Sequence, residues 1–306
     1  MDLLRSALWT RPLTPADRWA LLDAIYTDPH TYYYPGWTAL GDWLAQGLGW
    51  GLVFEDALVA ALVAVPESDI WAWLRLFTAR GDVPTGLAWR MLWRAAAAPL
   101  AAQGITHVVG LGGRRWVDRF FRQGGFRHTA DLRSLLWRGP ASALPAATPR
   151  ADLRIAPLPA DAVDAAAQVD RLAFDPAWRL RPELVHRVYA EARLALWACT
   201  PDGRAVGYVC FTPAPHGAHL ARLAVHPDWQ GQGVGRALVV QGLQRLSHSD
   251  PGLWVSVNTQ RANTRALRLY RRLGFEPNPT DQPLWVSPVP HATAASAPSA
   301  SALARP

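Results

Sequence analysis

The sequence repeats part of itself at a spacing of 149 residues, and this repeat limits the fold more than any other feature. The shift superimposes four short matches, Gly86 on Gly235, Ala88 on Ala237, Gly125 on Gly274 and Phe126 on Phe275. Both halves follow one order of expected strand, loop, helix, strand, helix and Gly-Phe, and that order counts against chance in a chain rich in Ala, Gly and Leu. We therefore expect two copies of one fold, the first of which has diverged further.

Two segments divide the chain into domains. Residues 139–151 combine small residues with three prolines, which is typical of a linker, and residues 287–306 have no hydrophobic periodicity, which predicts a disordered tail. Residues 1–138 and 152–286 remain. Each has the length of one domain, roughly 100–200 residues.

The pattern of residues 152–286 predicts a mixed α/β fold with a largely antiparallel front half. Two apolar runs around a Pro-Asp-Gly turn indicate a β-hairpin, and later segments alternate between helix and strand periodicity. The expected strands cover residues 153–155, 194–199, 205–212, 219–225, 253–257 and 283–286. The expected helices cover residues 159–174, 182–192, 263–273 and a segment that begins at 235.

All 31 basic residues are arginine, so the chain has no lysine. This composition excludes a Schiff base on lysine and the lysine of a Walker phosphate loop. The net charge of +7 favours acidic partners without identifying one, and we expect no nucleic-acid partner because the sequence has no motif of that kind. With two cysteines there is neither a disulfide framework nor a cysteine zinc cluster, and we expect no metal site.

A loop with three alternate glycines, Gln230-Gly231-Gln232-Gly233-Val234-Gly235, follows an apolar strand and opens onto a helix. Glycine lets the backbone turn tightly and expose its N–H groups, and a helix start adds N–H donors and partial positive charge. Together these features favour a pyrophosphate, with Arg236 either adding charge or serving as an exposed helix residue. The spacing differs from the Gly-x-Gly-x-x-Gly of a Rossmann fold.

This loop and a second motif resemble the GNAT (GCN5-related N-acetyltransferase) superfamily. Gln230, Gly233 and Gly235 match the family pattern Arg/Gln-x-x-Gly-x-Gly/Ala, which here follows Leu-Ala-Val-His-Pro. The run that begins at Asn263, 28 residues after Gly235, is similar to the family pattern Asn-x-x-Ala-x-x-x-Tyr-x-x-x-Gly-Phe. The resemblance covers the second half of the chain well and the first half in outline, and it implies two tandem GNAT domains.

The resemblance implies that acetyl-CoA binds in a V-shaped cleft, where the strand that ends at Val225 diverges from the strand 253–257. Backbone groups of the first strand would bind the pantetheine arm, and N–H groups of the loop would bind the pyrophosphate. The residues implied are Leu223, Ala224, Val225, Gln230, Gly231, Gln232, Gly233, Val234, Gly235, Arg236, Asn258 and Asn263. Asn263 is equally suited to cap its helix, and the two roles are compatible.

Tyr270 occupies the position at which many family members keep a tyrosine near the thioester sulfur. A phenol with an ordinary pKa of about 10 can protonate a departing thiolate, and a packed helix aromatic is the alternative. Direct transfer also needs a base for the amine. Relatives often supply an acid before the loop, whereas this chain has His216 and His219, each of which can be a base or structural. A water relay stays open.

The first copy lacks the glycine loop and the tyrosine that the resemblance assigns to acetyl-CoA in the second. Its loop, residues 80–86, is two residues shorter in this comparison, and Pro84 stands where the second half has a glycine, which removes an N–H donor. Asp82 adds negative charge, and Phe121 aligns with Tyr270 but has no hydroxyl. We predict that this half keeps the fold, binds acetyl-CoA weakly or not at all, and shapes the acceptor pocket.

These observations predict an N-acetyltransferase that transfers an acetyl group from acetyl-CoA to a primary amine of a small molecule or peptide, by direct transfer in the C-terminal half. A non-catalytic acyl-CoA-binding sensor or scaffold is the alternative. The sequence shows neither a secretory signal nor an apolar stretch of membrane length, so we expect a cytoplasmic protein without membrane contact. The acceptor, the acyl length and the oligomeric state are not indicated.

Overall fold

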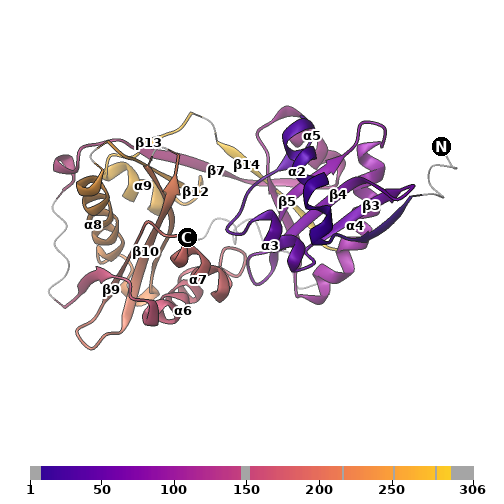
Figure 1. Ribbon diagram of the computed structural model, residues 1–306. Coiled ribbons are helices and arrows are strands. Elements are labelled where there is room, and N and C mark those ends of the chain that lie inside the picture. The colour runs from indigo at the N-terminus through magenta and orange to yellow at the C-terminus, as the bar shows by residue number, and fades with distance from the viewer. Residues whose placement is uncertain (1–7, 146–151, 216, 251, 280, 291–306) are drawn as a thin grey trace. The chain divides into compact units, whose positions relative to one another are not determined.

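The computed structural model describes residues 8–145, 152–215, 217–250, 252–279 and 281–290. These residues form two compact units (Figure 1). The first unit contains residues 8–129 together with 283–290, and the second contains the described residues between 130 and 282. Each unit is built on a β-sheet with helices packed against it, as the mixed α/β prediction requires.

The first unit buries both faces of its sheet, and the strand β4 (Ala57–Pro66) shows why. Alternate residues of a strand point to opposite faces. Ala60, Leu62 and Ala64 lie in one core cluster, and Ala61 and Val63 lie in another. One cluster includes α4 (Thr85–Ala102) and α5 (Arg115–Gln123), and the other includes α2 (Arg18–Thr27) and α3 (Leu40–Ala45). The strand order is β1 (Trp9–Pro12), β3 (Gly49–Phe54), β4, β5 (Trp71–Ala79), β6 (His107–Leu111) and β14 (Gln282–Pro288).

The second unit has an antiparallel front half and one parallel pair, β11 with β12. Its strand order is β7 (Arg127–Trp137), β12 (Trp254–Gln260), β11 (Gly217–Val225), β10 (Ala205–Ala214), β9 (Leu194–Cys199) and β8 (Arg154–Pro157). Its helices are α6 (Val163–Ala173), α7 (Pro182–Ala190), α8 (Val234–Ser249) and α9 (Thr264–Arg272), with short elements η2 (Ala141–Ala143), η3 (Ala160–Ala162), η4 (Pro227–Trp229) and β13 (Glu276–Pro277). The helical spacing predicted for α8 is confirmed, because Leu238, Val239, Leu243 and Leu246 are buried.

The last strand of each half belongs to the sheet of the other half. β14 pairs antiparallel with β6 of the first unit, where the yellow strand of Figure 1 lies among purple ones. β7, which ends the first half of the sequence, pairs antiparallel with β12 of the second unit. The compact units therefore differ from the boundaries expected from sequence, which kept residues 130–137 in the first domain and residues 283–286 in the second.

Parts of the expected linker and tail are structured. In the linker, residues 141–143 form η2, and Leu144 packs into the core of the second unit. At the tail, β14 continues to Pro288, and the N–H of Val289 donates to the carbonyl of Thr106 at 2.8 Å. Residues 146–151 and 291–306 lie outside the described residues.

The internal repeat is visible as one β-bulge at equivalent places in the two sheets. Arg75 is the extra residue of β5 against β4, and Ala221 is the extra residue of β11 against β10. Each bulge precedes the residue that caps the following helix, Pro84 for α4 and Gly233 for α8. Counting from bulge to cap gives nine residues in the first unit and twelve in the second, so the first loop is three residues shorter rather than two.

Candidate functional site

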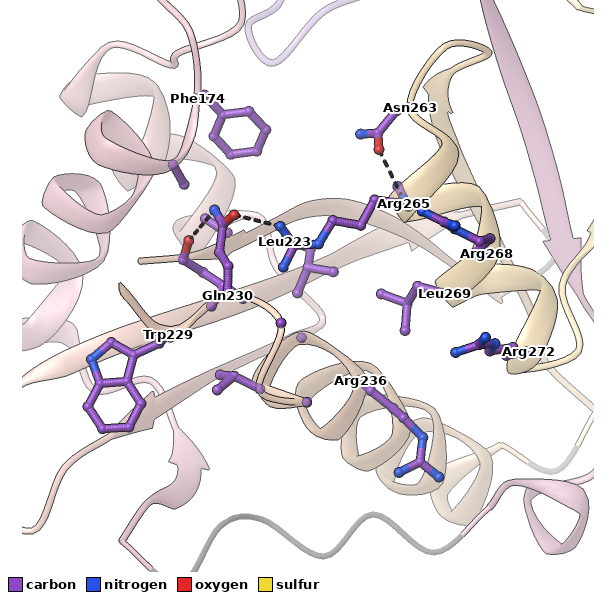
Figure 2. Close-up of a pocket in the computed structure, with 18 residues that line it drawn as sticks. Phe174, Leu223, Trp229, Gln230, Arg236, Asn263, Arg265, Arg268, Leu269 and Arg272 are labelled. Carbon is purple, nitrogen blue, oxygen red and sulfur yellow. Dashed lines mark hydrogen bonds between the residues drawn. The ribbon is translucent and has the colours of Figure 1, made fainter. Parts of the chain in front are cut away.

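A pocket of about 520 Å³ lies beside the glycine loop of the second unit. Figure 2 shows the eighteen residues that line it, which come from the end of α6, the end of β11, the loop, and the helices α8 and α9. The lining includes ten of the twelve residues assigned to acetyl-CoA from sequence, all except Gln232 and Asn258. Tyr270 and His219 are also outside the lining.

The pocket borders a fork between two strands. The parallel pairing of β11 and β12 ends at Leu220 with Val257. β11 continues to Val225 and β12 to Gln260 beyond that pair. The bulge at Ala221 lies immediately after the last shared pair, and a bulge bends its strand and increases the twist. The end of β11 therefore forms one arm of a V-shaped opening.

The glycine loop has a backbone conformation that favours glycine. Gly231 has φ +78° and Gly233 has φ +84°, both in the left-handed region. A Cβ atom added at either residue would meet nothing within 4 Å, so the space above the loop is open. Gly233 caps α8, whose first N–H groups have no carbonyl partner within the helix. Glycine is therefore required by the turn, and the turn brings donors and the positive helix end to the pocket.

Gln230 has a different role from the one expected. Its N–H donates to the carbonyl of Pro227 at 3.1 Å and is therefore not an open donor for a phosphate. Its side-chain Nε2 donates to the carbonyl of Val225 at 3.0 Å, and its Oε1 accepts from Arg265 Nη1 at 2.6 Å. Gln230 thus ties the end of β11 to α9. In the same loop, Gln232 Nε2 donates to the carbonyl of Asp228 at 2.6 Å.

The two asparagines lie at different parts of the site. Asn263 lines the pocket and caps α9, because its Oδ1 accepts from the N–H of Ala266 at 2.9 Å. The capping role left open by the sequence is therefore present. Asn258 follows Val257, the last residue of β12 that is paired with β11, and is exposed. It lies at the opening of the fork but not in the pocket wall.

Tyr270 lies on α9 and is buried in the core of the second unit, with 5% of its surface exposed. Its ring packs against that of Phe275, with centroids 5.3 Å apart. Burial raises the pKa of the Tyr270 hydroxyl above its usual value, so the phenol is protonated at neutral pH, as an ordinary tyrosine is, and is a weaker acid than an exposed one. Its neighbours Ala266 and Leu269 line the pocket.

His219 lies in the paired part of β11, one residue before the fork. Its Nδ1 is 2.9 Å from Ser256 Oγ on β12. Burial lowers the pKa of His219, which favours the neutral ring that a base requires. The other candidate base, His216, lies outside the described residues.

A buried ion-pair network behind the pocket was not expected from sequence. Asp170 on α6 is fully buried and accepts from Arg222 Nε at 2.6 Å, from Arg222 Nη2 at 2.7 Å and from the Tyr208 hydroxyl at 2.7 Å. Arg222 lies 3.6 Å from the ring centroid of Phe174, which lines the pocket, and donates to the carbonyl of Trp178 at 2.8 Å. The network joins α6, β10, β11 and the segment before α7.

Four arginines also line the pocket. Arg236 comes from α8, and Arg265, Arg268 and Arg272 come from α9 (Figure 2). The three on α9 are spaced by three and four residues and so share one face of the helix. Of the adjacent pair Arg271 and Arg272, Arg272 borders the pocket and Arg271 does not.

Comparison with known proteins identifies the class. Residues 164–275 match the model of the acetyltransferase (GNAT) family, which covers the pocket and both motifs. The structure is similar over 92% of the chain to a tandem GNAT protein from the clavulanic acid biosynthesis pathway, with a TM-score of 0.61, 16% identity and 98% of that chain covered. Residues 164–275 therefore belong to the GNAT acetyltransferase family, and the fold of the chain is that of two tandem GNAT domains.

Other relatives are similar over shorter stretches. Mycothiol acetyltransferase of Thermobifida fusca is 46% identical over 68 residues, which is 22% of this chain and 18% of that protein. Peptidyl-lysine N-acetyltransferase YjaB of Salmonella typhimurium is 38% identical over 95 residues, which is 31% of this chain and 57% of that protein. A GCN5-related N-acetyltransferase of Sphaerobacter thermophilus shares the fold, with a TM-score of 0.59, 18% identity, and 92% and 96% of the two chains covered. The aligned stretches span less than two thirds of the first two relatives.

Three further observations concern the described part of the chain. Its helices are too short or too polar to cross a membrane. No three His, Cys, Asp or Glu side chains in it are grouped so that they could hold a metal ion. Cys199 and Cys210 are both buried and free.

Proposed function

We propose that this protein is an N-acetyltransferase that uses acetyl-CoA as donor and the pocket of its second unit as the donor site. The observation that carries the proposal is the combination of an open left-handed glycine loop, a helix start and a strand fork around one pocket. An anionic diphosphate suits the N–H donors and positive end of α8, and an extended amide chain suits the free arm of β11.

The residues of the pocket fit such a donor in their charges and shape. The side-chain positions above Gly231 and Gly233 are open, so a phosphate can approach the backbone closely. The hydrogen bond from the Gln230 side chain to the carbonyl of Val225 fixes the backbone at the end of β11. Leu223 and Ala224 form part of the apolar pocket wall. The bound donor supplies an acetyl group activated as a thioester.

The reaction we propose is direct transfer. The amine nitrogen attacks the thioester carbonyl, so that a carbon–nitrogen bond forms and the carbon–sulfur bond breaks. Tyr270 donates its hydroxyl proton to the departing sulfur, a role supported by its position on α9, where its neighbours Ala266 and Leu269 line the pocket. His219 accepts the proton of the amine through water, a role supported by its place on β11 one residue before the fork, where burial keeps its ring neutral.

The acceptor we propose is a primary amine of a small molecule or peptide. The names of two relatives support these two classes, since one is a mycothiol acetyltransferase and the other a peptidyl-lysine N-acetyltransferase. Phe174 borders the pocket at the side opposite α9 in Figure 2, and we assign acceptor recognition to the segment that follows it, residues 175–193.

The test is calorimetric titration of acetyl-CoA into the full chain. We expect one site per chain, and we expect Gly233→Asp to abolish binding, because it adds a carboxylate where the phosphates lie. Gly86→Asp is the matched control at the start of α4, where the added Cβ has only Arg90 nearby, and it should bind as the unmodified chain does.

An amine screen that measures CoA release then tests the transfer itself. Release that depends on an amine and is lost in Gly233→Asp supports an enzyme. Binding without release for any amine would favour a sensor or scaffold. Two binding sites, or none, would contradict the proposal.

A further inference from the structure

One contact beside the fork has no role in the proposed function, the pair formed by His219 and Ser256. His219 Nδ1 lies 2.9 Å from Ser256 Oγ. The two residues are direct partners in the parallel pairing of β11 and β12, which ends one pair later, at Leu220 with Val257. The contact is therefore made one pair before the two strands separate.

The sheet fixes the direction of both side chains. The residues on either side of them are buried in the core of the second unit: Ala218, Leu220, Val255 and Val257. Because alternate residues of a strand point to opposite faces, His219 and Ser256 share the face of the sheet that lies opposite this core. Ser256 is also the antiparallel partner of Leu136 on β7. Its backbone is thus held between two strands, and its hydroxyl is fixed relative to the imidazole.

The hydrogen bonds of the His219 ring favour one tautomer. A neutral imidazole carries one N–H donor and one bare nitrogen acceptor. In the part of the chain that the structure describes, the ring has a partner at Nδ1 and none at Nε2. A partly buried N–H group is rarely left without an acceptor. The proton therefore belongs on Nδ1, where Ser256 Oγ accepts it, and the lone pair belongs on Nε2.

The hydroxyl of Ser256 also suits the protonated ring. Burial lowers the pKa of His219, and among the described residues no charged group adds to this effect. Once the ring takes a proton, both of its nitrogens become donors. Ser256 Oγ can accept from Nδ1–H in this state as it does in the neutral one, and a hydrogen bond to the charged form favours that form. The contact thus supports the ring before and after a proton arrives.

We propose that Ser256 is a positioning residue for His219, because it accepts the hydrogen bond of Nδ1–H and leaves the lone pair of Nε2 open to the acceptor amine. The ammonium group of the acceptor gives one proton through water to Nε2, and its neutral nitrogen then attacks the thioester. The imidazolium later releases the proton to bulk water. Ser256 acts only through His219. The inference rests on the proposed function, which makes His219 the base.

The first experiment is NMR of the histidine ring nitrogens in the full chain, which distinguishes the two neutral tautomers and needs no acceptor. The signals of His219 are those that disappear in His219→Gln. We expect the Nδ1–H tautomer in the unmodified chain and in Ser256→Thr, which keeps the hydroxyl. Ser256→Ala should shift the ring towards the Nε2–H tautomer. It should also lower the pKa of His219 further, because no hydrogen bond then opposes the effect of burial.

The second experiment measures CoA release across pH with the amine that gives the fastest release in the amine screen. Ser256→Ala should lower kcat about tenfold, because the hydrogen bond to the charged ring is lost. The acid limb of the pH profile should move to lower pH, and the affinity for acetyl-CoA should not change. Ser256→Thr should keep the rate and the profile.

Ser134→Ala is the matched control for both experiments. Ser134 is a partly buried serine of β7 that lies opposite Asn258, so the variant removes a hydroxyl from the same face of the sheet without touching His219. It should leave the tautomer, the rate and the pH profile unchanged. A loss of rate equal to that of Ser256→Ala would mean that any lost hydroxyl on this face has the same effect, and it would overturn the inference.

The other outcomes separate the inference from the proposed function. An Nε2–H tautomer in the unmodified chain, or a tautomer and pH profile that stay the same in Ser256→Ala, overturns the inference and leaves the proposed function intact. A Ser256→Thr variant that behaves as Ser256→Ala does would also overturn it, because the hydroxyl would then not be the group that matters. If no amine releases CoA, the positioning role falls together with the proposed function.

Discussion

The two units contain the same fork of parallel strands, and the two forks are filled differently: the fork of the second unit borders the pocket, and the fork of the first is occupied by its own chain. In the first unit, β5 and β6 are paired as far as Trp73 with Val109, and β5 then continues to Ala79. Beyond Trp73, a segment from earlier in the chain pairs with the part of β5 that β6 leaves unpaired. The short strand β2 (Tyr32–Tyr33) lies antiparallel to it, with Tyr32 opposite Phe77.

The side chain of Tyr32 completes the filling of the first fork. Its hydroxyl accepts from the N–H of Leu111 on β6 at 3.1 Å, and its ring packs on Phe121 with centroids 5.4 Å apart. Thr31 Oγ1 is 2.8 Å from Thr78 Oγ1 on the same arm. A peptide segment thus forms the contacts with both strands that a bound ligand would need to make.

This difference teaches how a duplicated fold can lose a site without losing its architecture. Unpaired strand edges and fork walls leave polar backbone groups that need partners. In the second unit we expect acetyl-CoA to supply them, and in the first unit Thr31–Tyr34 does. The loop before α4 adds to the loss, because Pro84 caps the helix where the second unit has the left-handed Gly233.

The largest effect we expect comes from the buried ion pairs near the two bulges. Asp170 pairs with Arg222 in the second unit, and Glu67 pairs with Arg75 in the first. Asp170→Asn and Glu67→Gln should each lower the free energy of unfolding by about 3–5 kcal/mol, since each leaves a buried arginine without its counterion. Urea denaturation measures this.

Acetyl-CoA binding separates the two pairs. Asp170→Asn should also weaken binding, because Arg222 supports Phe174 in the pocket wall, whereas Glu67→Gln should not. Weakened binding in Glu67→Gln, at a temperature where the variant is folded, would show that the first unit contributes to the donor site and would break the comparison.

Next in size is the hydroxyl of Tyr270. Tyr270→Phe should lower the rate of CoA release about a hundredfold, the scale of general acid catalysis, while the affinity for acetyl-CoA stays the same. Phe121→Tyr, the aligned change in the first unit, should leave both unchanged. Unaltered turnover in Tyr270→Phe would mean that the assignment of the acid is wrong.

A smaller effect is expected at the filled fork. Tyr32→Phe removes the acceptor of the buried Leu111 N–H and should lower the free energy of unfolding by about 1–3 kcal/mol. Titration should still give one acetyl-CoA site, because Pro84 and the shorter loop remain. Tyr33→Phe is the control, since Tyr33 is 39% exposed. A second acetyl-CoA site in Tyr32→Phe would mean that the Tyr32 hydroxyl alone prevents binding at the fork of the first unit.

The smallest effect is a pH dependence shared by both units. Burial lowers the pKa of His107 and of His219 in the folded state. The unfolded chain, with a pKa of about 6.5, then binds more protons, so the free energy of unfolding is highest above that pH and falls as the pH drops towards the lowered values. His107→Gln and His219→Gln should each flatten urea midpoints between pH 5 and 7, whereas the exposed His30→Gln should not.

Much of the second unit could be predicted because its local signals agree with its fold. The glycine loop, the Asn263 cap and the periodicity of α8 each depend on neighbouring residues, which a sequence displays directly. Asp170 was missed although it had a signal, since it falls at helical spacing with the buried Val163, Ala166 and Ala167. A carboxylate at such a position requires a buried partner.

Other features depend on contacts between residues far apart in the sequence. Nothing next to Tyr32 indicates that it pairs with Phe77 and reaches Leu111. The pairing of β14 with β6 likewise joins residues separated by more than half the chain, and the pattern of residues 283–286 predicts a strand but not its partner. The place of Arg265, Arg268 and Arg272 in the pocket wall could not be predicted either, because sequence does not show which face of a helix borders a pocket.

The exchange of end strands has a consequence for how this protein is made. The sheet of the first unit gains β14 only after nearly the whole chain has left the ribosome, and until then β6 has an open edge. The two halves therefore cannot mature one after the other as independent domains usually do. Pairing across such a distance slows folding, and exposed edges invite association with other chains. Separating the halves at residues 139–151 would thus leave each fragment without one strand of its sheet, so we expect neither fragment to fold as it does within the whole chain.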